Sequence, residues 1–287
     1  MNRTTRSCLC TLVLAAAIAA VPAGPAARAE EDLPSYLRDR GTGVATSMFG
    51  TYVRKGELLV YPFAEFYSDA DLEYKPSELG YSGDTDYRGR YSASEMLVWL
   101  GYGLTRDLAL EVEAAHIAAE LGKASADPSA VPDEVEEAGL GDVEAQLRWR
   151  FRHETAGGPE AFTYFETVFP LQKQRKMIGT SDWEWKLGVG VTKGLRSGTW
   201  TFRAATEYVR EERKFEAGEY ALEYLRQISP AWRAVAVIEG NQLDEVALIT
   251  GLQWRIGPRA VIKANNGWGL TTNATDLAPE IGMMFSF

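Results

Sequence analysis

Two histidines and their hydroxyl and carboxyl neighbours are the first candidates for catalytic chemistry. The chain has only His116 and His153. A hydrolytic triad needs a histidine within hydrogen-bond reach of a serine and of an orienting acid. His116 is followed by Asp127 and Ser129, but no nucleophile motif surrounds that serine. We therefore expect no catalytic residues and no enzyme, with a lipid hydrolase as the less favoured alternative.

Acidic and basic residues interleaved with apolar ones form a second set. In the segment 143–151, apolar residues alternate with Glu144, Gln146, Arg148 and Arg150. Successive side chains of a strand point to opposite faces, so one face would be apolar and the other polar. Similar alternation recurs along the chain and predicts a charged inner face. The candidate solute-contacting residues on that face are Glu111, Glu113, Glu144, Arg148, Arg150, Lys186, Arg203, Glu207 and Arg255.

This inner face has two possible roles, which the sequence leaves open. It could line a selective polar channel, or its opposite charges could brace a nearly closed interior, because buried ion pairs often add little net stability. No cofactor or metal is expected. The acids of 68–73 and 83–86 do not match a calcium-binding loop and predict a solvated external loop instead.

The first 29 residues have the three parts of a secretory signal peptide. Arg3 and Arg6 precede an apolar run at 8–21, and the small-residue motif Ala27-Arg28-Ala29 follows. The alternative is a membrane anchor, but the run of about 14 residues is shorter than the ~20 that a spanning helix needs. We expect cleavage after residue 29. The only cysteines, at 8 and 10, would leave with this peptide.

The charge of the remaining chain argues against one class of partner. The formal net charge is −10, and it becomes more negative without the three arginines of residues 1–29. Nucleic-acid binding requires a basic face, so we expect none.

Twelve segments of alternating polarity follow a common pattern. They are 57–67, 91–104, 108–119, 141–152, 160–169, 183–195, 199–210, 219–228, 232–239, 245–256, 259–268 and 277–287. Their connections alternate between short and long, as the periplasmic turns and external loops of outer-membrane barrels do. In hydrocarbon every backbone polar group must be paired, and closure of the sheet achieves this. We predict an all-β, transmembrane, antiparallel up-and-down barrel of about twelve strands at 57–287. Pro62 is expected to interrupt or delay the first strand.

The two ends of the predicted barrel carry further expectations. The last strand ends on the aromatic Phe287, which is typical of barrels inserted by the outer-membrane barrel assembly machinery. Outer-membrane lipid and lipopolysaccharide would surround the barrel. Residues 30–56 precede the first strand, and 41–53 are too apolar for a plain linker. Residues 41–53 either fold into the lumen as a plug or ligand gate, or they form a periplasmic tail or an early extra strand.

Four stretches resemble one known family. They are RGTGVATSMFGTY at 40–52, ELLVYPF at 57–63, ASEMLVWLGYG at 93–103 and GLGDVE at 139–144. They look like the outer-membrane proteins grouped as the meta-pathway of phenol degradation family. The resemblance implies a transporter-like barrel, associated in some members with uptake of aromatic or hydrophobic compounds. It supplies no binding or catalytic residues.

The combined expectation is a porin-like channel in the cell outer membrane. It would facilitate passive uptake of small organic solutes, with aromatic or hydrophobic ones favoured by the resemblance. The main alternative is a sealed outer-membrane barrel that transports nothing.

Overall fold

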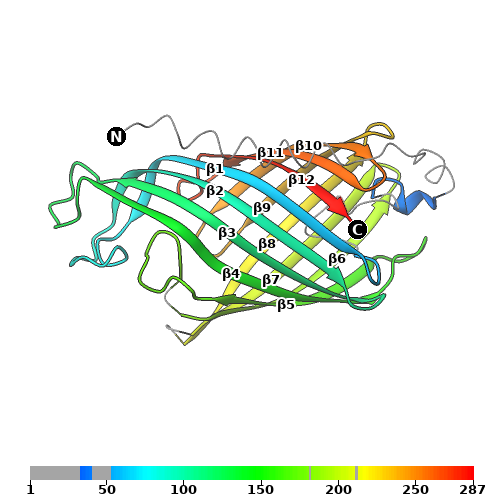
Figure 1. Cartoon of the computed structure of the whole chain (residues 1–287), viewed down its shortest axis with the longest axis horizontal. Coiled ribbons are helices and arrows are strands. Elements are labelled where there is room, and N and C mark those ends of the chain that lie inside the picture. The colour runs from blue at the N-terminus through cyan, green and yellow to red at the C-terminus, as the bar shows by residue number, and fades with distance from the viewer. Residues whose placement is uncertain (1–32, 41–52, 181, 211–212) are drawn as a thin grey trace.

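The computed structural model describes residues 33–40, 53–180, 182–210 and 213–287, which include twelve β-strands and one short 3-10 helix (Figure 1). Residues 41–52 of the predicted plug stretch 41–53 and the predicted signal peptide lie outside the described residues. The elements are η1 (Ser35–Leu37), β1 (Leu58–Tyr74), β2 (Tyr87–Gly103), β3 (Leu108–Gly122), β4 (Glu134–Arg152), β5 (Glu160–Phe169), β6 (Glu184–Leu195), β7 (Gly198–Val209), β8 (Lys214–Gln227), β9 (Trp232–Gly240), β10 (Val246–Gly257), β11 (Ala260–Gly269) and β12 (Leu277–Ser286).

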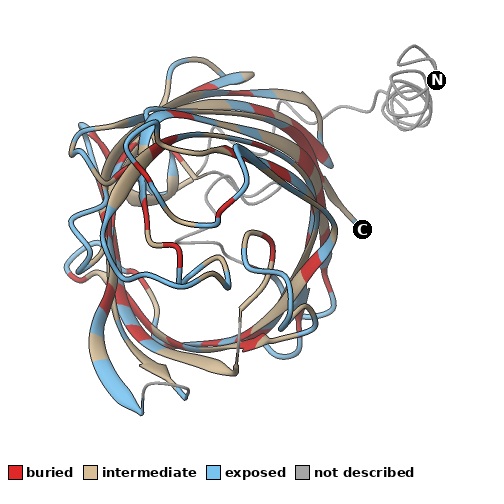
Figure 2. Cartoon of the chain, turned by 90° about the vertical axis from the view of Figure 1, so that its left-hand side faces the viewer, coloured by how far each residue is buried: buried red, intermediate tan, exposed pale blue. Residues whose placement is uncertain are grey.

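Each strand pairs with its neighbours in sequence, and β1 pairs with β12 to close the barrel. All pairs are antiparallel, so the predicted fold class and strand number are confirmed. Closure leaves no sheet edge unpaired. Seen from the end that carries the long loops, the wall forms a continuous ring (Figure 2). Within the described ranges, no helix is long and apolar enough to span a bilayer.

Alternation along each strand separates an inner from an outer face. On β3 and β4 the inward Glu111 and Arg148 are buried, whereas their neighbours Leu110 and Leu147 are 39% and 42% exposed. Large exposed apolar side chains on a protein surface mark contact with another apolar phase. Here they occur on the outer faces of neighbouring strands all round the barrel. The outer face therefore matches the hydrocarbon of a membrane.

Aromatic side chains border this apolar band at two heights. Near the short turns, the Trp232 and Trp254 rings stack with centroids 5.6 Å apart. Near the long loops, Trp185 stacks on Tyr208 at 5.7 Å. On β7, Trp200 and Tyr208 belong to the two levels, and the step of eight positions from one to the other rises roughly 20 Å at ~3.3 Å per residue and ~40° of tilt. This is close to the apolar height of known outer-membrane barrels, about 25 Å.

Several strands extend further at the long-loop end than predicted. β1 continues to Tyr74, β2 begins at Tyr87 and β4 begins at Glu134. The prediction placed these polar stretches in loops because they lack apolar alternation. Beyond the membrane both faces of a strand meet water, so the alternation is not required there.

Two details of the first strand correct the prediction. The strand runs through Pro62, which pairs with Val98 of β2, so the expected interruption is wrong. Asp71 and Glu73, expected in a solvated loop, lie in β1 and form ion pairs with Arg88 at 3.5 and 2.9 Å.

Candidate transport lumen

All nine predicted solute-contacting residues lie on the inner face of the barrel, on the side opposite the exposed apolar residues of their strands. Six of them line a cavity of about 230 Å³, the inner cavity. They are Glu111, Glu113, Glu144, Arg148, Lys186 and Arg203. The other three, Arg150, Glu207 and Arg255, are not among the residues that line it.

A buried polar group holds one wall of the inner cavity. Glu111 of β3 accepts hydrogen bonds from the Gln146 amide at 2.8 Å and from the Arg148 guanidinium at 3.3 Å. The Arg148 guanidinium also lies 5.3 Å from the centre of the Phe162 ring. Charge-assisted bonds of this kind are the stronger ones in proteins. They fix these side chains against the wall instead of leaving them free in the lumen.

Lys186 connects the adjoining part of the wall. Its ammonium group lies 3.3 Å from Glu166 and 2.7 Å from Glu219. Glu219 in turn accepts a hydrogen bond from Arg203 at 3.2 Å. These four residues come from β5, β6, β8 and β7, so the network ties four neighbouring strands together.

Glu113 and Glu144 also line the inner cavity, but they do not belong to these two ion-pair networks. They are directly paired across β3 and β4, and neither forms an ion pair with a described residue. Like charges directly opposite on a sheet are destabilising. The structure therefore keeps an unfavourable pair of carboxylates at the wall of the inner cavity.

A second cavity of about 460 Å³, the outer cavity, lies toward the long loops and also contacts Arg203 and Glu219. Glu65, Glu239 and Glu280 contribute carboxylates to it from three strands. Its apolar wall includes Leu72, Ala247 and Ile249. The outer cavity thus presents an acidic side and an apolar side.

The lining of the two cavities is strongly acidic. Nine carboxylates and three cationic side chains line them, and these twelve are Glu65, Glu111, Glu113, Glu144, Glu166, Glu219, Glu239, Glu245, Glu280, Arg148, Lys186 and Arg203. A passage lined by one sign of charge concentrates ions of the other sign. The electrostatics of the lumen favour cations over anions.

Sequence reasoning missed several of these acids. Glu166 and Glu219 lie in or beside weakly patterned segments, and Glu65 lies in a strand without clear alternation. The sequence around Glu280 did alternate, and that signal could have placed its carboxylate in the lumen.

Aromatic rings lie flat on the inner wall because glycines leave room for them. A Cβ atom on Gly188 would come 2.1 Å from the Tyr164 ring, and one on Gly190 would come equally close to the Phe162 ring. Both rings come from β5, which pairs with β6. The glycines of β6 therefore keep these two bulky side chains against the wall.

Apolar side chains replace charged ones on part of the inner wall at the short-turn end of the lumen. An apolar cluster lies inside the barrel there, formed by Val53, Leu59, Tyr61, Phe63, Leu97, Trp99, Ala109, Val261 and Met284. Trp99 also lines the inner cavity, so the cluster borders that cavity. On β1 this makes the inner face apolar as well as the outer face, which explains why the first strand showed no clear alternation.

Arg150 lies at this short-turn end. Its guanidinium contacts Glu160 at 3.4 Å, the Arg106 carbonyl at 2.6 Å and Asp107 at 3.8 Å. The predicted inward position is found, but these contacts hold turns and strand ends together. A role in solute contact does not follow from them.

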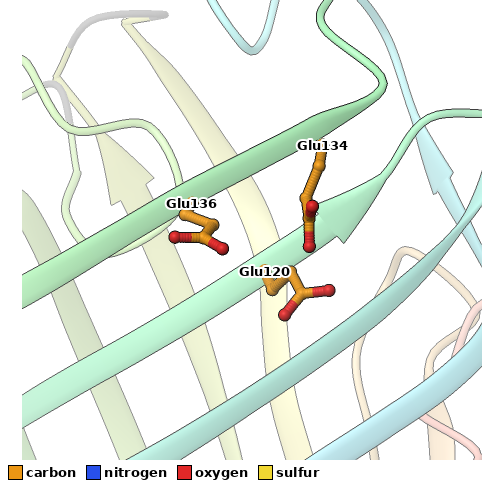
Figure 3. A group of neighbouring side chains, drawn as sticks. All are labelled: Glu120, Glu134 and Glu136. Atoms are coloured by element: carbon orange, nitrogen blue, oxygen red, sulfur yellow. The ribbon is translucent and has the colours of Figure 1, made fainter. Parts of the chain in front are cut away.

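A group of acidic side chains also lies outside the lumen. Glu120, Glu134 and Glu136 gather at the long-loop ends of β3 and β4, where all three are exposed (Figure 3). Exposed acidic groups of this sort repel each other only weakly in water. They mark a part of the barrel that lies in solvent.

The residues considered for a hydrolase are not assembled. His116 is exposed on the outer face of β3, paired with Met96 and Leu140. Asp127 accepts hydrogen bonds from the Tyr74 hydroxyl at 2.9 Å and from the Ser129 backbone at 2.7 Å. The strand continues for six residues beyond His116, about 20 Å at ~3.3 Å per residue, before this loop begins. The geometry does not support a triad.

Comparisons with known proteins agree with the barrel. No protein-family profile and no curated protein sequence matches the chain. Among solved structures, an outer membrane channel from Pseudomonas putida F1 is similar, with a TM-score of 0.61 and 12% identity over 83% of this chain and 98% of that one. The translocator domain of the autotransporter NalP from Neisseria meningitidis has a TM-score of 0.50 and 10% identity, over 81% of this chain and 89% of that domain. These likenesses establish the fold, and they agree with the predicted outer-membrane location.

Proposed function

We propose that the chain is an outer-membrane channel that facilitates passive uptake of small organic solutes. The observation that carries the proposal is the pair of charge-lined cavities inside a closed barrel whose outside is apolar. A barrel of twelve strands is wider than the eight-stranded ones that side chains alone can fill. The likeness to a channel from Pseudomonas putida supports the same function.

The substrate class within this proposal includes aromatic or hydrophobic compounds. The sequence resemblance to the meta-pathway of phenol degradation family implies such solutes. The apolar wall of Leu72, Ala247 and Ile249 in the outer cavity offers a surface for them. Pockets for organic ligands typically combine an apolar wall with a few placed polar groups.

Two measurements test the channel. Purified protein in planar lipid bilayers should give discrete ion currents, and cells that contain it should take up labelled aromatic amines or phenols faster than cells without it. Equal uptake of every solute with and without the protein would remove the transport proposal, whatever the current.

A sealed barrel is the second candidate, and the apolar cluster at the short-turn end favours it. Conductance measurements distinguish the open channel from the sealed barrel. A folded barrel that passes no current at any voltage would be a sealed surface protein.

The proposed partners are the surrounding lipid, lipopolysaccharide and the barrel assembly machinery, which would recognise the C-terminal strand. Phe287 is 68% exposed, and its backbone pairs with Leu58. Phe287→Ser should lower the amount of protein assembled in the outer membrane. Phe215→Ser, which changes an exposed phenylalanine on β8, serves as control and should assemble normally. Equal assembly of the two variants would contradict recognition through Phe287.

A further inference from the structure

We infer that residues 34–40, here called the latch, hold the short-turn end of the lumen closed and gate the channel. The inference rests on the proposed function. Its first support is the position of the residues that the latch contacts. Glu160, Gly194, Thr199, Gln227 and Arg233 all lie at the short-turn ends of β5 to β9, on inward-facing positions. The latch therefore lies inside the mouth of the barrel.

Asp39 provides the central attachment of the latch. Its side chain is 1% exposed, and its carboxylate accepts hydrogen bonds from the Gln227 N–H at 2.9 Å and the Thr199 hydroxyl at 3.4 Å. Its carbonyl oxygen accepts a hydrogen bond from the buried Arg233 guanidinium at 2.6 Å. A buried carboxylate is stable only when such donors surround it. These donors come from three different strands, β7, β8 and β9.

Arg40 provides the second attachment. Its guanidinium forms ion pairs with Glu154 and, at 3.4 Å, with Glu160. Glu154 also accepts a hydrogen bond from the Gly194 N–H at 2.8 Å and lies 3.2 Å from Lys193. The docked Arg40 therefore supplies part of the positive charge that these two buried carboxylates need.

The barrel wall at β6 fits closely against the latch. A Cβ atom on Gly194 would lie 1.8 Å from the Tyr36 carbonyl oxygen, so only glycine permits this close approach. The Lys193 ammonium lies 5.4 Å from the centre of the Tyr36 ring. Such a fit between β6 and the latch indicates a specific docked position instead of a loosely packed tail.

The latch and the apolar cluster together close the same end. The cluster covers the inner faces of β1 to β3, β11 and β12, and the latch covers β5 to β9. The attachments of the latch are hydrogen bonds and ion pairs, which water can replace, whereas the cluster is apolar. None of the barrel strand pairs depends on the latch. Undocking would therefore open one side of the mouth without unfolding the barrel.

The test compares Arg40→Ala with Arg38→Ala in the full chain. Both substitutions remove one arginine from the same segment, but Arg38 is exposed and outside the contacts above. Currents are measured in planar bilayers. Release of the latch is measured separately, as the rate at which trypsin cleaves after Arg38 in the folded wild type and in Arg40→Ala. We expect Arg40→Ala to raise the fraction of time spent open on the order of tenfold and to speed cleavage, because loss of a buried ion pair shifts a two-state equilibrium by such factors. Arg38→Ala should conduct as the wild type does.

The other outcomes overturn the inference in distinguishable ways. Faster cleavage with unchanged current would show a released segment that is not a gate, and the channel itself would stand. Unchanged cleavage and unchanged current would show that Arg40 does not hold the segment. Faster cleavage in barrels that carry no current in any variant would remove gating and the proposed channel together.

Discussion

Glu113 and Glu144 give the clearest conflict between stability and function at the scale of single residues. Two carboxylates directly opposite on β3 and β4 repel each other, yet they lie at the wall of the inner cavity. Sites that keep such conflicts are often functional ones. A passing cation would relieve the repulsion, which connects this pair with the selectivity of the lumen.

The double variant Glu113→Gln/Glu144→Gln should lower the ratio of cation to anion permeability. A unit charge at several ångströms in a water-like medium is worth roughly 0.5–1 kcal/mol to a passing ion, so loss of the negative charge on this pair should lower the ratio about two- to fivefold. The reversal potential in a potassium chloride gradient measures it. Glu120→Gln/Glu136→Gln is the matched control, since both residues are exposed outside the lumen. Equal shifts in both double variants would contradict a role for the lumen pair.

Arg148 and Glu111 test the bracing role of buried charge. Their side chains are 9% and 5% exposed and 3.3 Å apart. Arg148→Ala should lower the free energy of unfolding by roughly 3–5 kcal/mol, because an unpaired charge stays buried. Tryptophan fluorescence during guanidinium unfolding in lipid vesicles measures it. Arg148→Met/Glu111→Gln should recover much of the loss. An Arg148→Ala barrel as stable as the wild type would show that the pair does not brace the wall.

At the scale of elements, the glycines of β6 let the aromatic rings of β5 lie against the wall instead of projecting into the lumen. Gly188→Ala would place a methyl group where the Tyr164 ring now lies, so the ring must move into the lumen. We expect a lower single-channel conductance in this variant. Gly157→Ala, in the turn before β5, adds the same group in open space and should conduct normally. A Gly188→Ala channel with full conductance would mean that the ring can move elsewhere.

The connection between β5 and β6 has a pH dependence of predictable sign. The Trp183 N–H, with Arg210 and Lys173, holds the pKa of Asp182 below its usual range. A lowered folded-state pKa means that the contribution is complete above the ordinary value of about 3.9 and is lost as pH falls through the folded value. Proteolysis within 170–180 should speed up in that acid range. In Asp182→Asn the rate should already be raised at neutral pH and should change little with acid.

The strands of the barrel were easier to predict from the sequence than the contacts inside the lumen. Twelve strands could be counted because hydrocarbon outside and polar groups inside impose alternation. The alternation disappears where that contrast disappears, as at 68–74 and 134–140 in water and on β1 beside the apolar cluster. The six cavity residues on β3, β4, β6 and β7 followed from the same pattern. The contacts of Asp39 and Arg40 could not be predicted from the sequence, because they depend on which strand ends meet at the mouth of the barrel.

For the whole molecule, closure of the barrel separates two tasks. The outer face, with its apolar band and aromatic borders, meets lipid, and the inner face can hold charge without meeting hydrocarbon. Changes inside the lumen can therefore alter transport while the outer surface still matches the membrane. This separation is what allows the variants above to be compared in folded barrels.

The two cavities and the apolar cluster also make the two ends of the barrel interior different. Carboxylates line the outer cavity toward the long loops, whereas the opposite end holds the apolar cluster on one side and the ion-paired latch on the other. A passage whose fixed charge differs between its two ends should rectify, so that equal voltages of opposite sign drive unequal currents once the protein is inserted in a single orientation. A current–voltage curve that is symmetric about zero would mean that the carboxylates of the outer cavity do not control ion entry. The direction of rectification would also report which way each molecule has inserted.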